Sequence, residues 1–169
     1  MAEASRPELA QALRQGLRSL AKAVVVITCR HEGKRYAMAA TAVSELSLDP
    51  PSMLICVNKI ASLFLPLSAG ADFCINILHA DHVEISKRCS GTAKGEARFD
   101  IGSWSDSTLG IPVLDEAQAA FVCRNRSCTK FGTHGIFIGE VLEVVSVEQA
   151  DPLIYVDGRY SRVQPTFGC

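Results

Sequence analysis

Residues 36–62 read YAMAATAVSELSLDPPSMLICVNKIAS and predict two strands separated by a Pro-Pro break. The first half, Met38–Ser47, carries small and hydroxylated side chains, which let a flat ligand lie close to the backbone. The second half is an apolar strand that ends in Asn58-Lys59, with Ser62 shortly after. An amide, an ammonium and a hydroxyl at a strand end can hold a phosphate. The stretch therefore predicts a site for a flat ring with a phosphate tail, the layout of a flavin nucleotide.

Composition limits the classes of protein that this chain can belong to. The 169 residues are 48% hydrophobic and 21% charged, which predicts one folded, soluble domain over residues 1–169. The net charge is -1 and there is no basic tract, so we expect no nucleic-acid partner. No apolar run approaches the ~20 residues that cross a bilayer, so we expect no membrane span. The N-terminus, MAEASRPELAQAL, lacks the pattern of a signal peptide, and a cytoplasmic protein is expected.

The cysteines predict reduced thiols and no metal site. There are seven, an odd and scattered set without a CxxC pair. Cys123 and Cys128 are too far apart for a close metal pair, and no histidine cluster follows them. Cys29, Cys56 and Cys74 fall in apolar strands and are expected to be buried as small hydrophobic residues, whereas Cys169 is expected to be an exposed thiol.

Three segments predict helices. Residues 6–22 place leucines at helical spacing behind a Ser5–Glu8 capping box, so we expect an amphipathic helix that lies on the protein body. Residues 60–69 predict a short helix whose N-terminus favours a phosphate. Residues 81–89 predict a helix capped by Asp81, with Glu84 completing a capping box.

About seven short strands at hairpin spacing make up the rest of the pattern. The segments that predict them are 23–29, 36–46, 53–57, 73–78, 117–128, 134–147 and 153–156. Gly139 interrupts the longest of these strands and predicts a bulge or a close approach. Strands do not alternate with helices and no GxGxxG occurs, so a Rossmann domain is disfavoured. A mainly β fold, a closed antiparallel barrel with flanking helices, fits the pattern.

Five motifs in order give the chain a family resemblance. They are T-A-x-S-x-x-S-L-D-P-P (residues 41–51), CVNKIAS (56–62), FCINIL (73–78), Gly132-Thr133-His134, and PLIY followed by Tyr160 (152–160). Together they resemble the short-chain flavin reductases, the reductase components of two-component flavin monooxygenases. The resemblance covers about residues 21–160, which would be the domain core. It implies an FMN-binding split barrel, usually a homodimer with its site near the subunit interface.

The resemblance also implies an activity and the residues that serve it. The expected reaction is hydride transfer from NADH or NADPH to FMN or FAD, which supplies reduced flavin to a separate oxygenase. Ring contacts are expected from the backbone N–H groups of residues 39–42, and ribityl or phosphate contacts from two serines of the following strand. The full set of expected cofactor-binding residues is Ala39, Ala40, Thr41, Ala42, Ser44, Ser47, Cys56, Val57, Asn58, Lys59, Ser62, Phe99, His134, Arg159 and Tyr160.

His134 is the expected catalytic residue, because in the resembling family this position lies near the nicotinamide and orients the hydride donor. Thr133 stands where the family more often has Asp, which gives the G-T-H form of hydroxyphenylacetate-type reductases. Arg159 and Tyr160 are expected near the pyridine nucleotide. Two alternatives stay open: the same site could reduce a corrin-bound cobalt or a ferric complex, or the chain could be a flavin-binding module without catalysis.

Overall fold

The computed structural model describes residues 5–164, which form three antiparallel sheets and a few short helices. The main sheet has seven strands in the order β3-β2-β6-β9-β10-β5-β4. Their bounds are β2 Val25–His31, β3 Lys34–Ala40, β4 Val43–Leu48, β5 Pro51–Asn58, β6 Phe73–Ile77, β9 Ala119–Phe131 and β10 His134–Ser146. A small sheet, β1-β11-β12, joins Lys22–Ala23, Leu153–Val156 and Arg159–Arg162. A third pairs β7 Trp104–Asp106 with β8 Pro112–Leu114.

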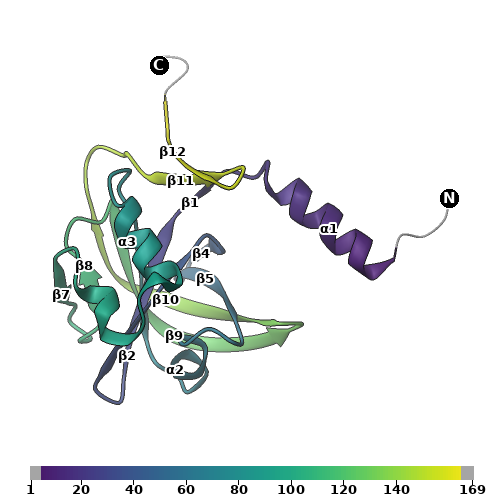
Figure 1. Cartoon of the computed structure of the whole chain (residues 1–169). Helices are drawn as coiled ribbons and strands as arrows, with labels where there is room; N and C mark the ends of the chain where they lie inside the picture. Colours follow the sequence, from purple (N-terminus) through teal and green to yellow (C-terminus); the bar gives the residue numbers. More distant parts are fainter. Residues whose placement is uncertain (1–4, 165–169) are drawn as a thin grey trace.

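The main sheet curls on itself but does not close (Figure 1). Its two end strands, β3 and β4, follow one another in the chain and are connected through Thr41 and Ala42. The segment that the sequence predicts as one strand, 36–46, is therefore broken at these two residues. A split barrel is confirmed, and the closed barrel expected from strand spacing alone is wrong. The break leaves β3 with one free edge, which becomes the floor of the site described below.

Two of the three buried clusters lie on opposite faces of the main sheet. One packs inside the curl and includes Ile27, Ile55, Phe73 and Phe137, all with no exposed surface. The other lies beneath α3 (Val83–Lys87), the π-helical turn η1 (Arg88–Thr92) and the 3-10 helix η2 (Gly95–Phe99). This second cluster packs the helical segments against β3.

Gly139 fulfils both predictions made for it. The register between β10 and β9 shifts between Ile138 and Gly139, which is a bulge. A Cβ atom at Gly139 would lie 2.5 Å from Cζ of Phe73 and 2.6 Å from Cβ of Cys123, distances that real Cβ atoms do not reach. Only a glycine lets the two strands and the Phe73 ring approach this closely.

Three helix predictions need correction. α1 (Arg6–Leu17) begins at the expected capping box, where the Ser5 backbone N–H donates to Glu8 at 2.8 Å, but it does not lie on the body. None of its residues is buried, and it extends away from the sheets (Figure 1). Its leucine stripe has no partner within residues 5–164: Leu9 and Leu13 are 63% and 61% exposed. An ion pair of 2.8 Å between Arg18 and Asp157 ties the segment after this helix to the turn that joins β11 and β12.

The other two helices begin later than predicted because nearby polar groups bind elsewhere. α2 spans only Phe64–Ser68, since the Asn58 side chain accepts the Ile60 N–H and the chain turns before the helix starts. It is too short to offer a phosphate site at its N-terminus. α3 begins at Val83 without a side-chain cap, because Asp81 accepts a hydrogen bond from Arg162 and Glu84 pairs with Lys87.

Candidate functional site

The free edge of β3 presents backbone groups to a groove. Because β3 ends the sheet order, every second residue directs its N–H and C=O away from β2. The Arg98 guanidinium donates to the Ala37 carbonyl, which identifies Ala37 as one of these outward residues. The same alternation turns the backbone of Ala39 outward and that of Ala40 toward β2. Ala39 therefore offers an unpaired N–H at the floor of the groove, as expected for a ring contact, whereas Ala40 offers its methyl group.

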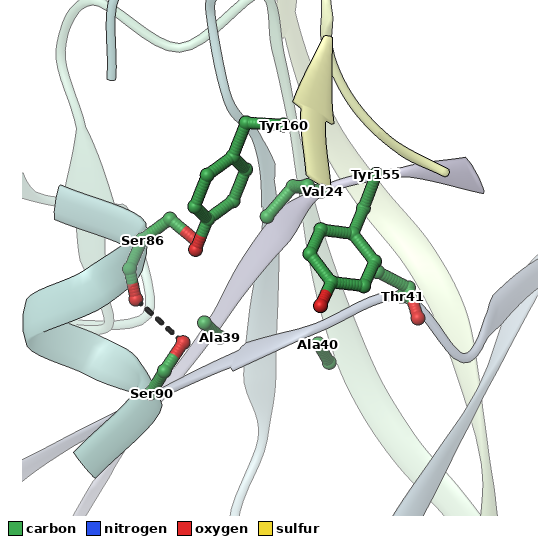
Figure 2. A pocket seen from close by; sticks show the side chains of 8 residues that line it. All are labelled: Val24, Ala39, Ala40, Thr41, Ser86, Ser90, Tyr155 and Tyr160. Atoms are coloured by element: carbon green, nitrogen blue, oxygen red, sulfur yellow. Dashed lines mark hydrogen bonds between the residues drawn. The ribbon is translucent and has the colours of Figure 1, made fainter. Parts of the chain in front are cut away.

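A cavity of about 340 Å³ lies directly above this floor. Figure 2 shows two tyrosine rings, from β11 and β12, above the small residues of β3. The Tyr160 hydroxyl lies 3.0 Å from Oγ of Ser86, and the two rings meet edge to face with centroids 5.5 Å apart. The lining residues are Val24, Ala39, Ala40, Thr41, Ser86, Ser90, Tyr155 and Tyr160. Small side chains below and fixed aromatic rings above make a slot suited to a planar ring.

Two further cavities adjoin this slot. One, of about 610 Å³, shares Ala39 and Ser90 with the slot, and because it is lined by Asn58, Lys94 and Arg98 we call it the polar cavity. The other, of about 450 Å³, shares Thr41 with the slot and lies beyond the end of β3. We call the three together the β3 groove. The polar cavity is lined by Met38, Ala39, Asn58, Ile60, Ala61, Ser62, Cys89, Ser90, Lys94, Gly95 and Arg98. The third is lined by Leu20, Ala21, Lys22, Ala23, Thr41, Ala42, Val43, Leu54 and Cys56.

The polar cavity has the groups that a phosphate needs. Arg98 donates to Oγ of Ser62 at 3.2 Å, which places a cation and a hydroxyl at the same point. Cys89 also lines this cavity, but burial raises its pKa to about 11 even though Arg98 and Arg88 lower it, so its thiol stays protonated. The groove therefore offers a ring slot and, beside it, a polar cavity suited to an anion.

Eight of the fifteen predicted cofactor-binding residues line the groove. They are Ala39, Ala40, Thr41, Ala42, Cys56, Asn58, Ser62 and Tyr160. Groove residues outside the predicted set include Tyr155, Ser86, Ser90 and Arg98. Ser86 and Ser90 stand one helical turn apart, so their spacing was the available signal, but nothing in the sequence placed that helix over β3.

The other seven predicted residues lie outside the groove lining. Val57 is fully buried and Phe99 is 7% exposed; both side chains belong to the core. The Lys59 ammonium donates to the Gly132 carbonyl at 2.6 Å instead of facing the groove. The remaining four are Ser44 and Ser47 on β4, Arg159 at the start of β12, and His134.

His134 is exposed at the first position of β10, opposite Asn58 of β5. Its Nδ1 lies 2.9 Å from the Thr133 hydroxyl, so the threonine of the G-T-H motif contacts the imidazole directly. Asn58 lines the polar cavity, so its strand partner His134 lies beside that cavity and outside the lining of the ring slot. Its expected place beside a nicotinamide stays a prediction.

Within residues 5–164, histidine, cysteine, aspartate and glutamate form no group of three that could hold a metal ion. In the same range no helix is long and apolar enough to cross a membrane.

Comparisons of the sequence and of the structure with known proteins both find flavin reductases. The family described as "Flavin reductase like domain" matches residues 17–164. The reductase component of the FADH(2)-dependent resorcinol hydroxylase of Rhizobium sp. (strain MTP-10005) is 34% identical, over 92% of this chain and 88% of the relative. The FMN reductase (NADH) RutF of Agrobacterium fabrum is 36% identical, over 87% of this chain and 84% of the relative.

Among solved structures, the NADH:FAD oxidoreductase of Streptomyces globisporus C-1027, in complex with NAD and FAD fragments, superposes with a TM-score of 0.87. It is 26% identical, and the match covers 98% of this chain and 99% of the other. The family match extends over nearly all of the described chain, including β3, the groove above it and both tyrosine-bearing strands. The chain belongs to the flavin reductase like domain family.

Proposed function

We propose that this protein is an NAD(P)H-dependent flavin reductase, an NAD(P)H:flavin oxidoreductase of the EC 1.5.1 type. It would transfer hydride from NADH or NADPH to FMN or FAD and supply the reduced flavin to a separate monooxygenase. The observation that carries the proposal is the β3 groove, with a ring slot of about 340 Å³ and a polar cavity beside it. The relatives named as NADH-dependent FMN reductases and as a hydroxylase reductase component support it.

The residues present fit a flavin. Three alanines at positions 39, 40 and 42 leave room for a flat ring above β3, and the outward N–H of Ala39 can donate to its polar edge. When bound, the flavin supplies the hydride acceptor, so the chain needs neither a nucleophile nor a strong acid. Its own task is to position two rings, and the Tyr155–Tyr160 pair forms one wall of the slot.

We propose that His134 orients the hydride donor, with Thr133 fixing its ring through the 2.9 Å contact. His134 lies beside the polar cavity and does not line the ring slot. The nicotinamide must therefore approach His134 from outside the ring slot of the same chain. A second copy of the chain could bring the two together. His134→Ala should then slow hydride transfer with little change in flavin affinity. An equal loss of flavin binding would make it a residue of the phosphate end instead.

The proposed assembly is a homodimer with its site near the subunit interface. Apolar side chains that face solvent in the single chain support it: Leu9, Leu13, Leu17 and Leu20 before β1, Leu46 and Leu48 on β4, and Leu142, Val144, Val145 and Val147 at the end of β10. We also propose a cytoplasmic setting. The free cysteines at 29, 56, 74, 89, 123 and 128 are the form that a reducing compartment preserves.

Ala39→Leu tests the assignment of the groove. The larger side chain would enter both the ring slot and the polar cavity, because Ala39 lines both. We expect flavin affinity to fall by about tenfold or more, since overpacking a preformed slot forces it open. Ala12→Leu, on exposed α1, is the matched control and should bind flavin like the parent protein. Unchanged flavin affinity in Ala39→Leu would remove the groove from the proposal.

A further inference from the structure

A fourth cavity, of about 310 Å³, continues the β3 groove past its polar end. It shares Ser62, Gly95 and Arg98 with the polar cavity and lies at the N-terminal half of β3. Its lining residues are Gly33, Lys34, Arg35, Tyr36, Ala37, Ser62, Gly95, Glu96 and Arg98. Arg98 therefore stands between the two cavities, with space on either side of its guanidinium.

The charge of Arg98 is not neutralised by any carboxylate among residues 5–164. Its guanidinium donates to neutral oxygens only: the Ala37 carbonyl, the Ala93 carbonyl at 3.0 Å and Oγ of Ser62 at 3.2 Å. Six other arginines pair with carboxylates, namely Arg18, Arg30, Arg35, Arg88, Arg126 and Arg162. Arg98 is also partly buried, so solvent screens it incompletely. A held, partly buried and unpaired guanidinium is suited to a phosphate.

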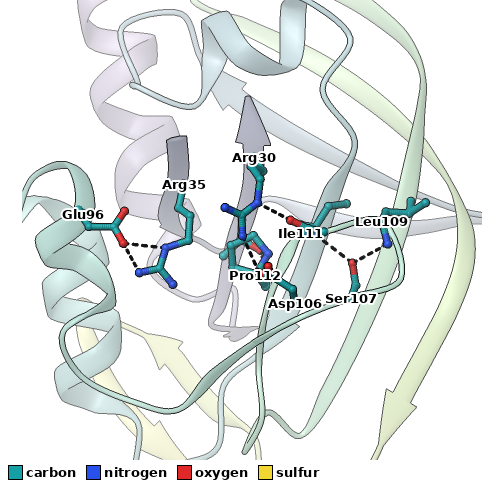
Figure 3. Close-up of polar contacts among 10 residues, drawn as sticks. Arg30, Arg35, Glu96, Asp106, Ser107, Leu109, Ile111 and Pro112 are labelled. Atoms are coloured by element: carbon teal, nitrogen blue, oxygen red, sulfur yellow. Dashed lines mark hydrogen bonds and ion pairs between the residues drawn. The ribbon is translucent and has the colours of Figure 1, made fainter. Parts of the chain in front are cut away.

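The surroundings of Arg98 extend this positive charge. Lys34, Arg35, Lys94 and Arg98 line the two cavities, and Glu96 is the one carboxylate among the lining residues. Four cations against one carboxylate give these two cavities an excess of positive charge, whereas the chain as a whole has a net charge of -1. Figure 3 shows the Arg35 guanidinium forked onto Glu96, and the same group lies 4.2 Å from the centre of the Phe99 ring. Arg35 is thus fixed at the rim of the fourth cavity.

The length of the groove decides which flavin fills it. Thr41 lines the ring slot and Arg35 lines the fourth cavity, six residues away on an extended strand, which corresponds to about 20 Å. FMN carries one phosphate, and with its ring in the slot it would end in the polar cavity beside Arg98. FAD continues with a second phosphate and an adenosine, which need further room and further positive charge. The fourth cavity supplies both, together with the Tyr36 side chain in its wall.

We propose that the fourth cavity binds the adenylate half of FAD, with Arg98 beside the pyrophosphate and Arg35 at the outer end of the cavity. As a consequence, FAD binds more tightly than FMN. This rests on the proposed function and specifies its flavin. The relatives include both an FMN reductase and a reductase for an FADH(2)-dependent enzyme, so their names leave the choice between the two flavins open.

Calorimetric titration of the full-length protein with FAD and with FMN tests the proposal without turnover. The parent protein should bind FAD about tenfold more tightly, as one added charge-assisted phosphate contact would give. Arg35→Met should weaken FAD by about fivefold or more and leave FMN within about twofold. Arg98→Lys should weaken both flavins, because both place a phosphate beside it. Arg126→Met, which removes an exposed arginine paired with Glu140, should change neither.

Glu96→Gln distinguishes a direct effect of Arg35 on FAD binding from an effect of the broken ion pair on the fold. It breaks the same ion pair as Arg35→Met, so a purely structural effect would move FAD affinity in the same direction in both variants. The proposal requires opposite directions: Glu96→Gln should tighten FAD by about two- to fivefold, since it removes a nearby negative charge. Equal affinity for the two flavins, with Arg35→Met changing neither, would overturn the proposal and leave the reductase intact. A rise in the KM for NADH in Arg35→Met, with no change in FAD affinity, would assign the cavity to the nicotinamide dinucleotide and also overturn the proposal. Binding of neither flavin would overturn the proposed function itself.

Discussion

Gly139→Ala should destabilise the protein strongly, and the size of the effect follows from two contacts. The new Cβ would lie 2.5 Å from Cζ of Phe73 and 2.6 Å from Cβ of Cys123. The Cys123 Cβ is fixed by its own backbone, and the Phe73 ring has no exposed surface into which it could turn. Neither neighbour can move away by a simple side-chain rotation, so the strands must separate. Overpacking costs about 1–3 kcal/mol, and two simultaneous clashes place this site at about 2–3 kcal/mol.

Thermal unfolding measures this cost directly. For a chain of this size each kcal/mol lowers the Tm by about 2–4 °C, so Gly139→Ala should lower it by about 4–12 °C. Gly16→Ala is the matched control, because nothing lies within 4 Å of a Cβ there and α1 has no buried residue. It should leave the Tm within about 2 °C of the parent. A Tm for Gly139→Ala that matches this control would refute the close approach of β10, Phe73 and β9.

Three further predictions concern the slot, the pH response and the thiols. Tyr160→Phe removes the 3.0 Å contact to Ser86, so it should cost about 1 kcal/mol of stability and raise the KM for NADH more than it lowers kcat; an unchanged KM would place Tyr160 outside the nucleotide site. Burial, followed by the nearby His79, lowers the pKa of His82 below 6.5, so the unfolded chain binds more protons as the pH falls below that value. The stability that neutral His82 contributes is present above about pH 6.5 and lost below it, and the Tm of His82→Gln should fall less than that of the parent between about pH 7.5 and 5.5; identical falls would contradict this. Alkylation of the native protein, followed by peptide mapping, should modify exposed Cys128 before the buried thiols, whose pKa values burial raises; early modification of a buried thiol would contradict the packing. Those buried thiols are Cys29, Cys74, Cys89 and Cys123.

The sequence predicts most strands because their signals are local. Alternating and β-branched runs define the β2–β3 hairpin, and a glycine within a long strand predicts the bulge at Gly139. Helix starts are less predictable from the sequence than strands. A capping box forms only where its carboxylate is not bound by another side chain, and the sequence does not show this. Asp81 and Glu84 satisfy the pattern but bind Arg162 and Lys87 instead. The prediction for Cys169 lies outside the described residues.

The site could be predicted only in part because its walls come from distant segments. The small residues of β3 and its neighbours are visible in one stretch, and most of them do line the groove. The residues above them, Ser86 and Tyr155, come from α3 and β11, and no local pattern places these elements over β3.

Ion pairs are likewise not predictable from distance along the sequence. Glu96 is two residues from Arg98 in the sequence, but it pairs with Arg35, and Arg98 donates to the Ser62 hydroxyl instead. This pairing depends on the position of η2 against β3, which the order of residues does not show.

The most direct test of the proposed reductase is NADH oxidation by the purified protein, followed by the loss of NADH absorbance, with no flavin, with FMN and with FAD. The proposed function predicts oxidation that depends on added flavin and saturates with it. The assignment of the fourth cavity to FAD predicts in addition that saturation needs a lower concentration of FAD than of FMN. NADPH should be tested in parallel, because the proposal covers both nucleotides. Flavin that binds stoichiometrically while neither nucleotide is oxidised would contradict the reductase and leave a flavin-binding module.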